Sequence, residues 1–466
     1  MGARLQPLWS TSVFNWVVIA AGTTYVLLAG WLMAAAPYDI WGVLVVVPVV
    51  AVIGTAIVRR SFSRGFPQLQ RAAMVGLLAK LAGTLARYWV ANDAYGGLSD
   101  SNGYHDAGRL IAGNFHDGYV SIIGLIPHTR GTLFIHELTG FVYTIVGSSK
   151  LAGFVWFGLM GYTGVLLCVK AAYIAIPSMH SPNYAWLCFL MPSLVFWPSS
   201  VGKEAWMSLT LGMISMGTAL LFRGSHALAA SGWIAGGAVL SAMVRPHMAA
   251  IWLGAMALAL AIGLIAGTGL RIHRSRFRTL LVGVVALVAV VMVGKMAVNY
   301  LAPGSEDNGS VTQQVSGLLT MTESRTGQGG SAFTPVAVAG PLDYPEAIWR
   351  TLTRPLLYEA DGLTTLLPAL EMTGFVLLLA FSWRRLAAIP RLLTRRPFVL
   401  YNLLILVMFG LAFSTFANLA LLVRQRSLVM PAMLLMPCVP LRSGAHGQRG
   451  PATPAGYLVP APLPYH

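Results

Sequence analysis

The side chains best suited to acid–base chemistry lie in a polar stretch between residues 92 and 130. This stretch holds Asp93, Asp100 and Asp106 together with several histidines and arginines. Only 10% of the 466 residues are charged, so a cluster of this density needs an explanation. A carboxylate beside a substrate hydroxyl can act as a general base. We therefore predict that Asp100 is a catalytic base, with Asp93 as the second candidate.

Asp100 also has a structural interpretation. Within residues 103–112, apolar side chains recur at helical spacing, and His105 falls on a different face. This pattern predicts a short helix lying on the membrane surface. Asp100 or Ser101 would then cap the helix N-terminus, so both interpretations of Asp100 stay open. A second surface helix is predicted over residues 134–146.

Basic residues from well-separated places in the chain form a second group. Arginine is suited to bidentate contacts with phosphate, and a cation there would stabilise charge on a leaving phosphate. The predicted phosphate-binding residues are Lys203, Arg245, Arg350, Arg354, Arg424 and Arg426. The predicted supporting residues are His105, Asp106, Glu204, His247 and Glu359. Two histidines are a weak signal for a metal site, so none is predicted, and a divalent cation is left open.

These charged residues have structural interpretations too. Lys203 can anchor a helix at headgroup depth, beside Trp197. Glu204 is favoured at a helix N-terminus. A half-buried Arg245 needs an anionic partner, which would be either a protein carboxylate or a lipid phosphate. For the basic residues beyond position 340, a solvated ion-pair cluster is the alternative.

The composition indicates a membrane protein. Hydrophobic residues make up 56% of the chain, above the roughly 45–50% of soluble domains. Many apolar runs approach the roughly 20 residues needed to cross a bilayer. We predict an all-α polytopic integral membrane protein with about twelve transmembrane helices, at 15–35, 40–58, 72–91, 151–173, 184–199, 204–222, 229–244, 248–268, 279–301, 363–383, 398–417 and 427–441. The spans at 184–199 and 427–441 are short enough to be partly re-entrant.

The predicted spans divide the chain into segments separated by two long outer loops that carry short surface helices. The segments are a three-span start (1–91), a first outer loop with the candidate base (92–150), a central bundle (151–301), a second outer loop, flexible in part (302–362), the last spans (363–441) and a disordered tail (442–466). The three cysteines fall inside apolar runs, which indicates packing residues rather than disulfides.

The distribution of charge predicts the orientation. Arginine clusters follow the second, eighth and tenth predicted spans and Arg223 follows the sixth, all on the same side as the N-terminus. Basic loops are typical of the cytoplasmic side. Of the 15 acidic residues, all but Glu371, which lies within the tenth predicted span, map to the other side. We therefore predict a multi-pass plasma-membrane protein with both termini in the cytoplasm. The net charge of +16 is then the ordinary cytoplasmic bias, and nucleic acid is not expected as a partner.

Three segments share a pattern with a known superfamily. An outer-loop Asp100 is followed by Tyr104 and a short helix, a Pro/Gly turn occupies residues 127–131, and an apolar stretch covers 141–172. Together they resemble the GT-C superfamily of membrane glycosyltransferases, which take sugars from polyprenyl-phosphate donors on the outer or lumenal face. The resemblance implies transfer of a sugar to an acceptor glycan or lipid during assembly of the cell envelope.

The chain also departs from that superfamily. Three predicted spans precede Asp100, whereas the family places its catalytic Asp directly after the first span. The second acid of the family pattern is absent, because Ser101 and Asn102 follow Asp100. This departure keeps Asp93 in consideration as the base.

Two other functions stay open. The arginine-rich outer loops of the later half also resemble polymerases or ligases that use pyrophosphate-linked oligosaccharides. A transporter or flippase for lipid-linked saccharides should carry ionisable groups near the middle of its spans. The mid-span candidates are few, namely Lys80, Lys295 and Glu371, which favours chemistry at the surface.

Overall fold

The part of the chain that the structure describes is helical throughout. The computed structural model describes residues 11–62, 67–118, 131–224, 226–266, 341–360 and 362–441. These residues form no strand. Three expectations lie outside the described residues: the span at 279–301, the flexible segment at 302–340 and the tail at 442–466.

Most of the described residues lie in helices, the first beginning at Thr11 and the last ending at Cys438. The first half contains α1 (Thr11–Ala35), α2 (Tyr38–Trp41), α3 (Val43–Phe62), α4 (Pro67–Trp89), the π-helical turn η1 (Val90–Ala94), α5 (Asp100–His116), α6 (Gly131–Val146), α7 (Lys150–Ala175), α8 (Asn183–Leu190), α9 (Pro192–Phe196), α10 (Lys203–Arg223), α11 (Ala227–Ala242) and α12 (Pro246–Ile265). The second half contains η3 (Pro341–Asp343), α15 (Tyr344–Thr353), η4 (Leu357–Glu359), α16 (Leu363–Phe381), α17 (Trp383–Leu393), α18 (Pro397–Ala412), α19 (Leu419–Arg426), α20 (Met430–Leu435) and η5 (Met436–Cys438).

Local sequence explains where several helices begin and end. Pro246 and Pro397 stand at the first positions of α12 and α18, where a missing backbone N–H costs nothing. Gly224 ends α10 in the left-handed conformation, with φ of 64°. The predicted span at 184–199 is broken into α8 and α9, because Pro192 starts a new helix after Met191 in an extended conformation.

Several helices have the length and apolarity of membrane spans. Four qualify within the described residues, namely Tyr38–Phe62, α7, α10 and α12. Two bent pairs, α16 with α17 and α19 with the helical turns to Cys438, raise the number to six. The membrane character is therefore supported, and the count of about twelve spans is not confirmed. The orientation relative to the membrane stays a prediction.

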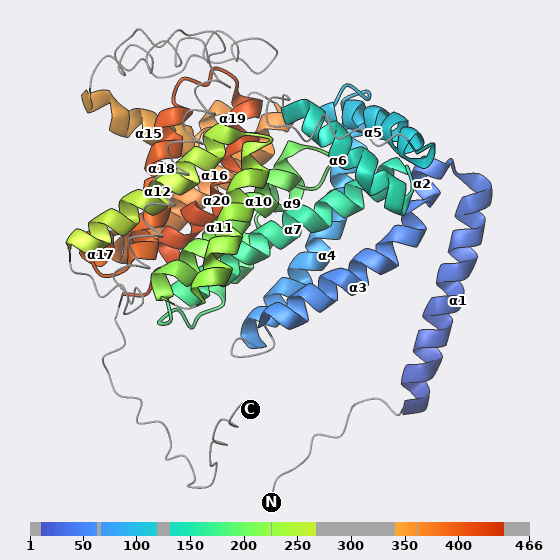
Figure 1. Cartoon of the computed structure of the whole chain (residues 1–466), viewed down its shortest axis with the longest axis horizontal. Helices are drawn as coiled ribbons and strands as arrows, with labels where there is room; N and C mark the ends of the chain where they lie inside the picture. Colours follow the sequence, from blue (N-terminus) through green and yellow to red (C-terminus); the bar gives the residue numbers. More distant parts are fainter. Residues whose placement is uncertain are drawn as a thin grey trace, which may run out of the picture.

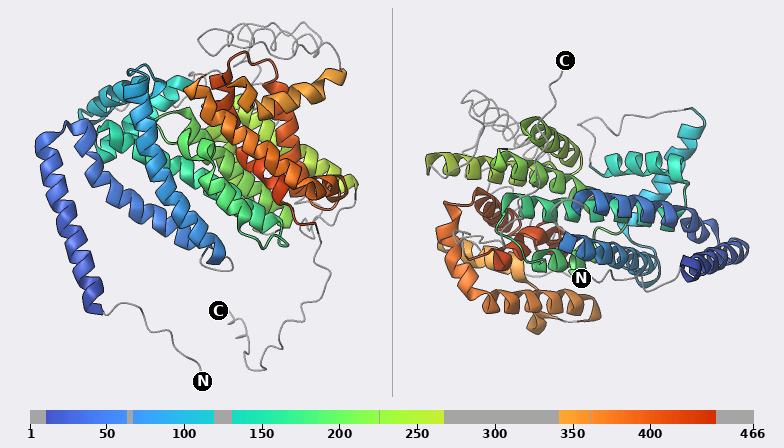
Figure 2. Two further views of the ribbon diagram at one scale, coloured as in Figure 1. Left: turned by 180° about the vertical axis from the view of Figure 1, so that it is seen from behind. Right: turned by 90° about the horizontal axis from the view of Figure 1, so that it is seen from below.

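The helices form a bundle centred on α7 and α10, with α1 standing apart at one edge (Figures 1 and 2). In the most apolar stretches of α7 and α10, 78% of the residues are buried, against 28% in Tyr38–Phe62. Small residues let these two backbones approach closely, as is common for helices packed in membranes. A Cβ atom added to Gly212 would lie 2.5 Å from the Gly164 carbonyl oxygen.

We expect Gly164→Ala to destabilise the bundle by about 1–3 kcal/mol, because its Cβ would overlap the Ser208 backbone carbonyl. Gly232→Ala on α11 is the matched control, since a Cβ there meets no atom within 4 Å. That change should be neutral or stabilise by roughly 0.5–1 kcal/mol. The measurement is the free energy of unfolding in mixed micelles titrated with denaturing detergent. Equal effects at the two positions would contradict the close crossing.

Two short helices cover one end of the bundle. α5 and α6 pack on each other there, and α6 also contacts α7 and α10 (Figure 1). We call this the α5 end, and α19 belongs to it because Arg424 pairs with Asp100. The expected surface helices at 103–112 and 134–146 thus correspond to α5 and α6. α17 lies at the opposite end of α18, which we call the α17 end (Figure 1).

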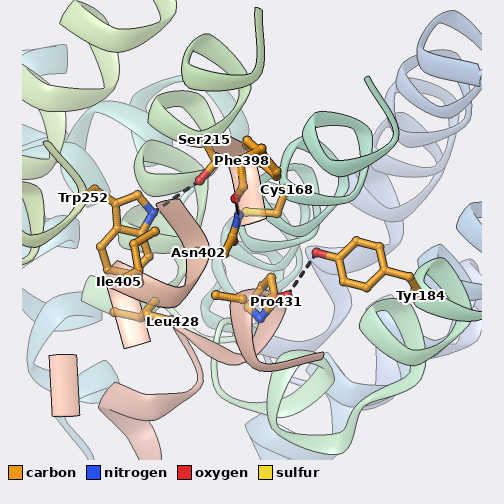
Figure 3. A pocket seen from close by; sticks show the side chains of 10 residues that line it. Cys168, Tyr184, Ser215, Trp252, Phe398, Asn402, Ile405, Leu428 and Pro431 are labelled. Carbon is orange, nitrogen blue, oxygen red and sulfur yellow. Dashed lines mark hydrogen bonds between the residues drawn. The ribbon is translucent and has the colours of Figure 1, made fainter. Parts of the chain in front are cut away.

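A small pocket lies among the central helices, lined mostly by apolar and uncharged polar side chains (Figure 3). Trp252 Nε1 donates to Ser215 Oγ at 3.3 Å, and Tyr184 OH donates to the Pro431 carbonyl at 3.1 Å. Cys168 also lines it and forms no disulfide, as is true of the other two cysteines. Because the lining contains no charged residue, we assign the pocket to packing rather than to catalysis.

Candidate functional site

The centre of the candidate site is a buried carboxylate held by two arginines. Glu204 lies in the first turn of α10, and its side chain is 3% exposed. Arg245, just before α12, donates from Nη2 to Glu204 Oε1 at 2.8 Å. Arg424 of α19 approaches the same carboxylate with two nitrogens, at 2.7 and 2.8 Å. Of the two expected partners for Arg245, the structure shows the protein carboxylate.

Arg424 links this buried pair to the predicted base. Its Nη1 donates to Asp100 Oδ2 at 2.7 Å. The Asp100 side chain is 61% exposed, whereas that of Arg424 is only 16% exposed. Asp100 is the first residue of α5, after the N-cap Ser99, and no side-chain hydrogen bond caps this helix. The structure therefore gives Asp100 an ion pair and access from outside instead of a capping role.

Arg87 is a further cation of this site that the sequence patterns did not indicate. It lies in the last turn of α4, 6% exposed, and interacts electrostatically with Arg424, Glu204 and Asp100. Its guanidinium carbon lies 5.0 Å from the ring centroids of both Phe196 and Trp197, which is cation–π distance. Its Nε and Nη1 atoms have no hydrogen-bond partner among the described residues.

Residues of α5, α6 and α10 complete the surroundings of Asp100. Tyr104 is buried beside Gly202, and its ring centroid lies 5.4 Å from that of His136. Burial first, and then the Asp100 and Glu204 carboxylates, raise the pKa of Tyr104 to about 12. Burial and nearby Lys203 lower the pKa of His136. At neutral pH the site therefore has a neutral phenol and a histidine that is disfavoured as a cation.

Positive charge exceeds negative charge in this group. Lys203 extends from the start of α10 and donates to Thr132 Oγ1 at 2.8 Å. The cations are thus Arg87, Lys203, Arg245 and Arg424, and the anions are Asp100 and Glu204. Arg245 Nη1 is also buried without a partner among the described residues. Cations in excess of carboxylates, two of them buried with unused donors, fit an anionic ligand such as phosphate.

The other predicted phosphate-binding residues have different partners. Arg350 forms an exposed ion pair with Glu346 on α15, which matches the solvated alternative. Arg354 pairs with Glu359 at 2.6 Å, and the buried Arg426 donates to the Arg354 carbonyl. Arg424 and Arg426 are two positions apart on one helix and therefore point in different directions. The structure brings three of the six predicted cations to Asp100, namely Lys203, Arg245 and Arg424.

The remaining candidate residues lie outside this ion-pair group. Asp93 is exposed in the π-helical turn after α4, and Asp106 is exposed on α5. Neither forms an ion pair with a described residue. His247 is half-buried on α12, with its ring centroid 6.0 Å from that of Phe413. Asp100 is therefore better placed than Asp93 to act beside the cations.

His105, on α5, belongs to a separate network of polar contacts. Its Nδ1 lies 2.8 Å from Tyr143 OH, and its Nε2 lies 3.6 Å from Asp39 Oδ1. Asp39 also accepts a hydrogen bond from the Lys150 backbone N–H at 3.1 Å. The network fastens α5 to α2, α6 and α7. Its geometry indicates a structural role for His105 rather than the supporting role that we predicted.

We expect His105 to make the protein acid-sensitive. Burial is the main cause that lowers the pKa of His105 from 6.5 to about 4, and Lys150 and Arg109 add to it while Asp39 and Asp106 oppose it. The unfolded chain takes up this proton near pH 6.5, so the folded state loses stability as the pH falls from about 7 to 4.

The measurement is the melting temperature in detergent at pH 7 and pH 5. His105→Gln should reduce the drop between the two values. His116→Gln is the control, because His116 is an exposed histidine on the same helix. If the melting temperature of His105→Gln falls between pH 7 and pH 5 by as much as that of the wild type, this assignment is refuted.

No group of three or more His, Cys, Asp or Glu side chains suited to a metal ion occurs among the described residues.

Taken together, the fold and the site define an all-helical membrane protein with a charged cluster at one end of its bundle. Comparison with protein-family models, with curated proteins and with solved structures finds no match to this chain.

Proposed function

We propose that the chain is a membrane glycosyltransferase that moves a sugar from a polyprenyl-phosphate donor to an acceptor glycan or lipid. The observation that carries this proposal is the exposed Asp100 carboxylate beside cations that outnumber the carboxylates, of which Arg87 and Arg245 are buried. The cations fit the donor phosphate, and the carboxylate fits an acceptor hydroxyl. The resemblance of Asp100 and the following helix to the GT-C superfamily points the same way.

In the proposed reaction, the acceptor oxygen attacks the anomeric carbon of the donor sugar. The bond between that carbon and the phosphate oxygen breaks, and polyprenyl phosphate leaves with the electron pair. Asp100 takes the proton of the acceptor hydroxyl. Arg87, Arg245 and Arg424 stabilise the charge that develops on the leaving phosphate.

The contact between Arg424 and Asp100 gives a reason for ordered binding. In the structure Asp100 Oδ2 accepts a hydrogen bond from Arg424 Nη1. A donor phosphate that accepts from this nitrogen would free the carboxylate for the acceptor hydroxyl. The two contacts of Arg424 with Glu204 would hold the guanidinium in place during this exchange. Binding of the donor therefore prepares the base.

The test is transfer by the purified protein in vesicles, with labelled polyprenyl-phosphate hexose and a mixture of envelope glycans as acceptors. We expect a product one sugar longer, with release of an equal amount of polyprenyl phosphate. A ladder of products from pyrophosphate-linked oligosaccharides would favour the polymerase or ligase alternative instead. If the donor stays intact with every acceptor tested, the transferase proposal is contradicted.

One feature favours a transporter for lipid-linked saccharides as the second candidate. Glu371 is half-buried in α16 and accepts a hydrogen bond from Ser193 N at 2.9 Å, and Arg426 is 1% exposed at the end of α19. The bent pair formed by α19 and the helical turns after it, with an angle of 61°, resembles the broken helices of transporters. Uptake of substrate into vesicles without a covalent product would favour this candidate.

A further inference from the structure

A separate positively charged region lies at the α17 end, opposite Asp100. α17 is bent by 74° relative to α16. Its sequence alternates arginines with apolar residues, and Leu392 is buried against the bundle. The side chains of Phe381 and Trp383 at the bend are 84% and 62% exposed. A basic amphipathic helix that turns away from a span, with a Trp at the turn, fits the plane of a membrane interface.

The positive charge of this region has no matching negative charge nearby in sequence. The last acidic residue of the chain is Glu371, and every Asp, Glu, Lys or Arg position that follows is an arginine. Those on α17 and between α17 and α18 are Arg384, Arg385, Arg391, Arg395 and Arg396. Such clusters at a bilayer surface attract anionic headgroups, with roughly 1 kcal/mol per cation.

A pocket of about 190 Å³ adjoins α17 at this end. Its polar lining residues are Arg385 and, after α7, Ser178, His180, Ser181 and Asn183. Met179, Tyr184, Cys438 and Pro440 supply the rest of its lining. A cavity of roughly 10–15 Å³ on the same measure holds one water molecule, so a phosphate headgroup has room.

The walls of this pocket are held in place. Arg385 Nη1 donates to the Pro437 carbonyl at 2.8 Å, which orients the guanidinium and leaves its other nitrogens without a partner in the described part of the chain. Tyr173 OH donates to the Ser181 carbonyl at 2.6 Å, and Gln68 Nε2 donates to the His180 carbonyl at 3.3 Å. The residues that face a ligand are therefore fixed by contacts that the ligand does not replace.

We propose that this pocket binds the phosphate headgroup of an anionic phospholipid, with α17 lying in the adjacent bilayer interface. Arg385 supplies the charge-assisted donor, and the serine hydroxyls and the Asn183 side chain supply neutral donors. The exposed Phe381 and Trp383 lie at the bend, where acyl chains begin. This site is independent of the proposed glycosyl transfer, because it shares no residue with the Asp100 group.

The test is native mass spectrometry of the full-length protein, purified in detergent with equal amounts of phosphatidylglycerol and phosphatidylcholine. We expect phosphatidylglycerol to be retained selectively, and Arg385→Gln to weaken its binding by about tenfold or more, as for loss of a charged hydrogen bond. Arg223→Gln is the matched control. It removes an exposed arginine at the last turn of α10, outside the pocket, and should bind as the wild type does.

A second variant keeps the proposal testable if Arg385→Gln does not fold. Ser178→Phe fills the pocket and keeps every charge, so it should also lower the retention of phosphatidylglycerol. Unchanged retention in a folded variant of either kind would overturn the proposal. Inorganic phosphate that raises the melting temperature as much as phosphatidylglycerol does would overturn the lipid assignment. Both measurements can succeed or fail whether or not the protein transfers a sugar.

Discussion

Asp100→Asn should lower the rate of sugar transfer by about 10²–10⁴-fold, the usual contribution of a general base. The amide keeps the size of the side chain but cannot take the proton of the acceptor hydroxyl. Arg424 keeps its two contacts with Glu204, so the phosphate-binding cations should stay in place. Binding of polyprenyl phosphate should therefore change much less than the rate of transfer.

The measurement is the single-turnover rate of transfer in vesicles, together with donor affinity from equilibrium binding. Asp117→Asn is the control, because Asp117 is an exposed carboxylate just after α5, outside the ion-pair group. The double variant of Asp93 and Asp100 to Asn tests the second candidate base. Full transfer activity in that double variant would show that neither carboxylate is the base.

Glu204→Gln should have the largest effect on stability, with a loss of about 3–5 kcal/mol. Removing one partner of a buried ion pair leaves the other charge buried and uncompensated, and here two arginines depend on one carboxylate. Arg245 would lose its only ion pair among the described residues. Arg424 would keep only its ion pair with Asp100, which lies at the exposed edge of the site.

The measurement is the free energy of unfolding in mixed micelles. Glu346→Gln is the control, since its ion pair with Arg350 is exposed and such pairs contribute roughly 0–1 kcal/mol. Combining Glu204→Gln with Arg245→Gln should cost less than the sum of the two single changes. A Glu204→Gln variant as stable as Glu346→Gln would contradict the buried position of the carboxylate.

The helices and their positions were largely predictable, because long apolar runs have few alternatives to a helix in a membrane. Periodicity also located the helices α5 and α6 between the longer apolar runs. The breaks were harder to place. The chain is apolar on both sides of Pro192 and of the turn at Ser382. The sequence therefore predicts that these segments are apolar, but it does not predict the angle between the two helices that meet at each break.

The composition of the site was only partly predictable. Sequence indicated that Asp100, Lys203, Arg245 and Arg424 face one side of the membrane, but sidedness does not specify contacts. Arg424 pairs with Glu204 and Asp100 across 220 and 324 residues, and no local pattern predicts such distances. Arg87 was missed because it lies within an apolar span. Its spacing from Lys80, seven residues earlier on the same helix face, was the available signal.

His105 shows how burial changes the interpretation of a candidate. Its position on a helix face apart from the apolar side chains suggested that it supports catalysis. The structure buries it, because Tyr143 and Asp39 offer polar partners from two other elements. Only tertiary contacts distinguish a histidine that serves a substrate from one that fastens two helices together.

The sequence separations within the Glu204 ion pairs have a consequence for biosynthesis. Arg245 follows Glu204 by 41 residues, so these two charges can neutralise each other as soon as α10, α11 and α12 have left the ribosome. Arg424 is made almost 180 residues later, and only then can Asp100 gain its partner. The ion pairs around Glu204 are therefore incomplete during most of the protein's synthesis, and a chain that stops short of α19 lacks the residue that pairs with Asp100.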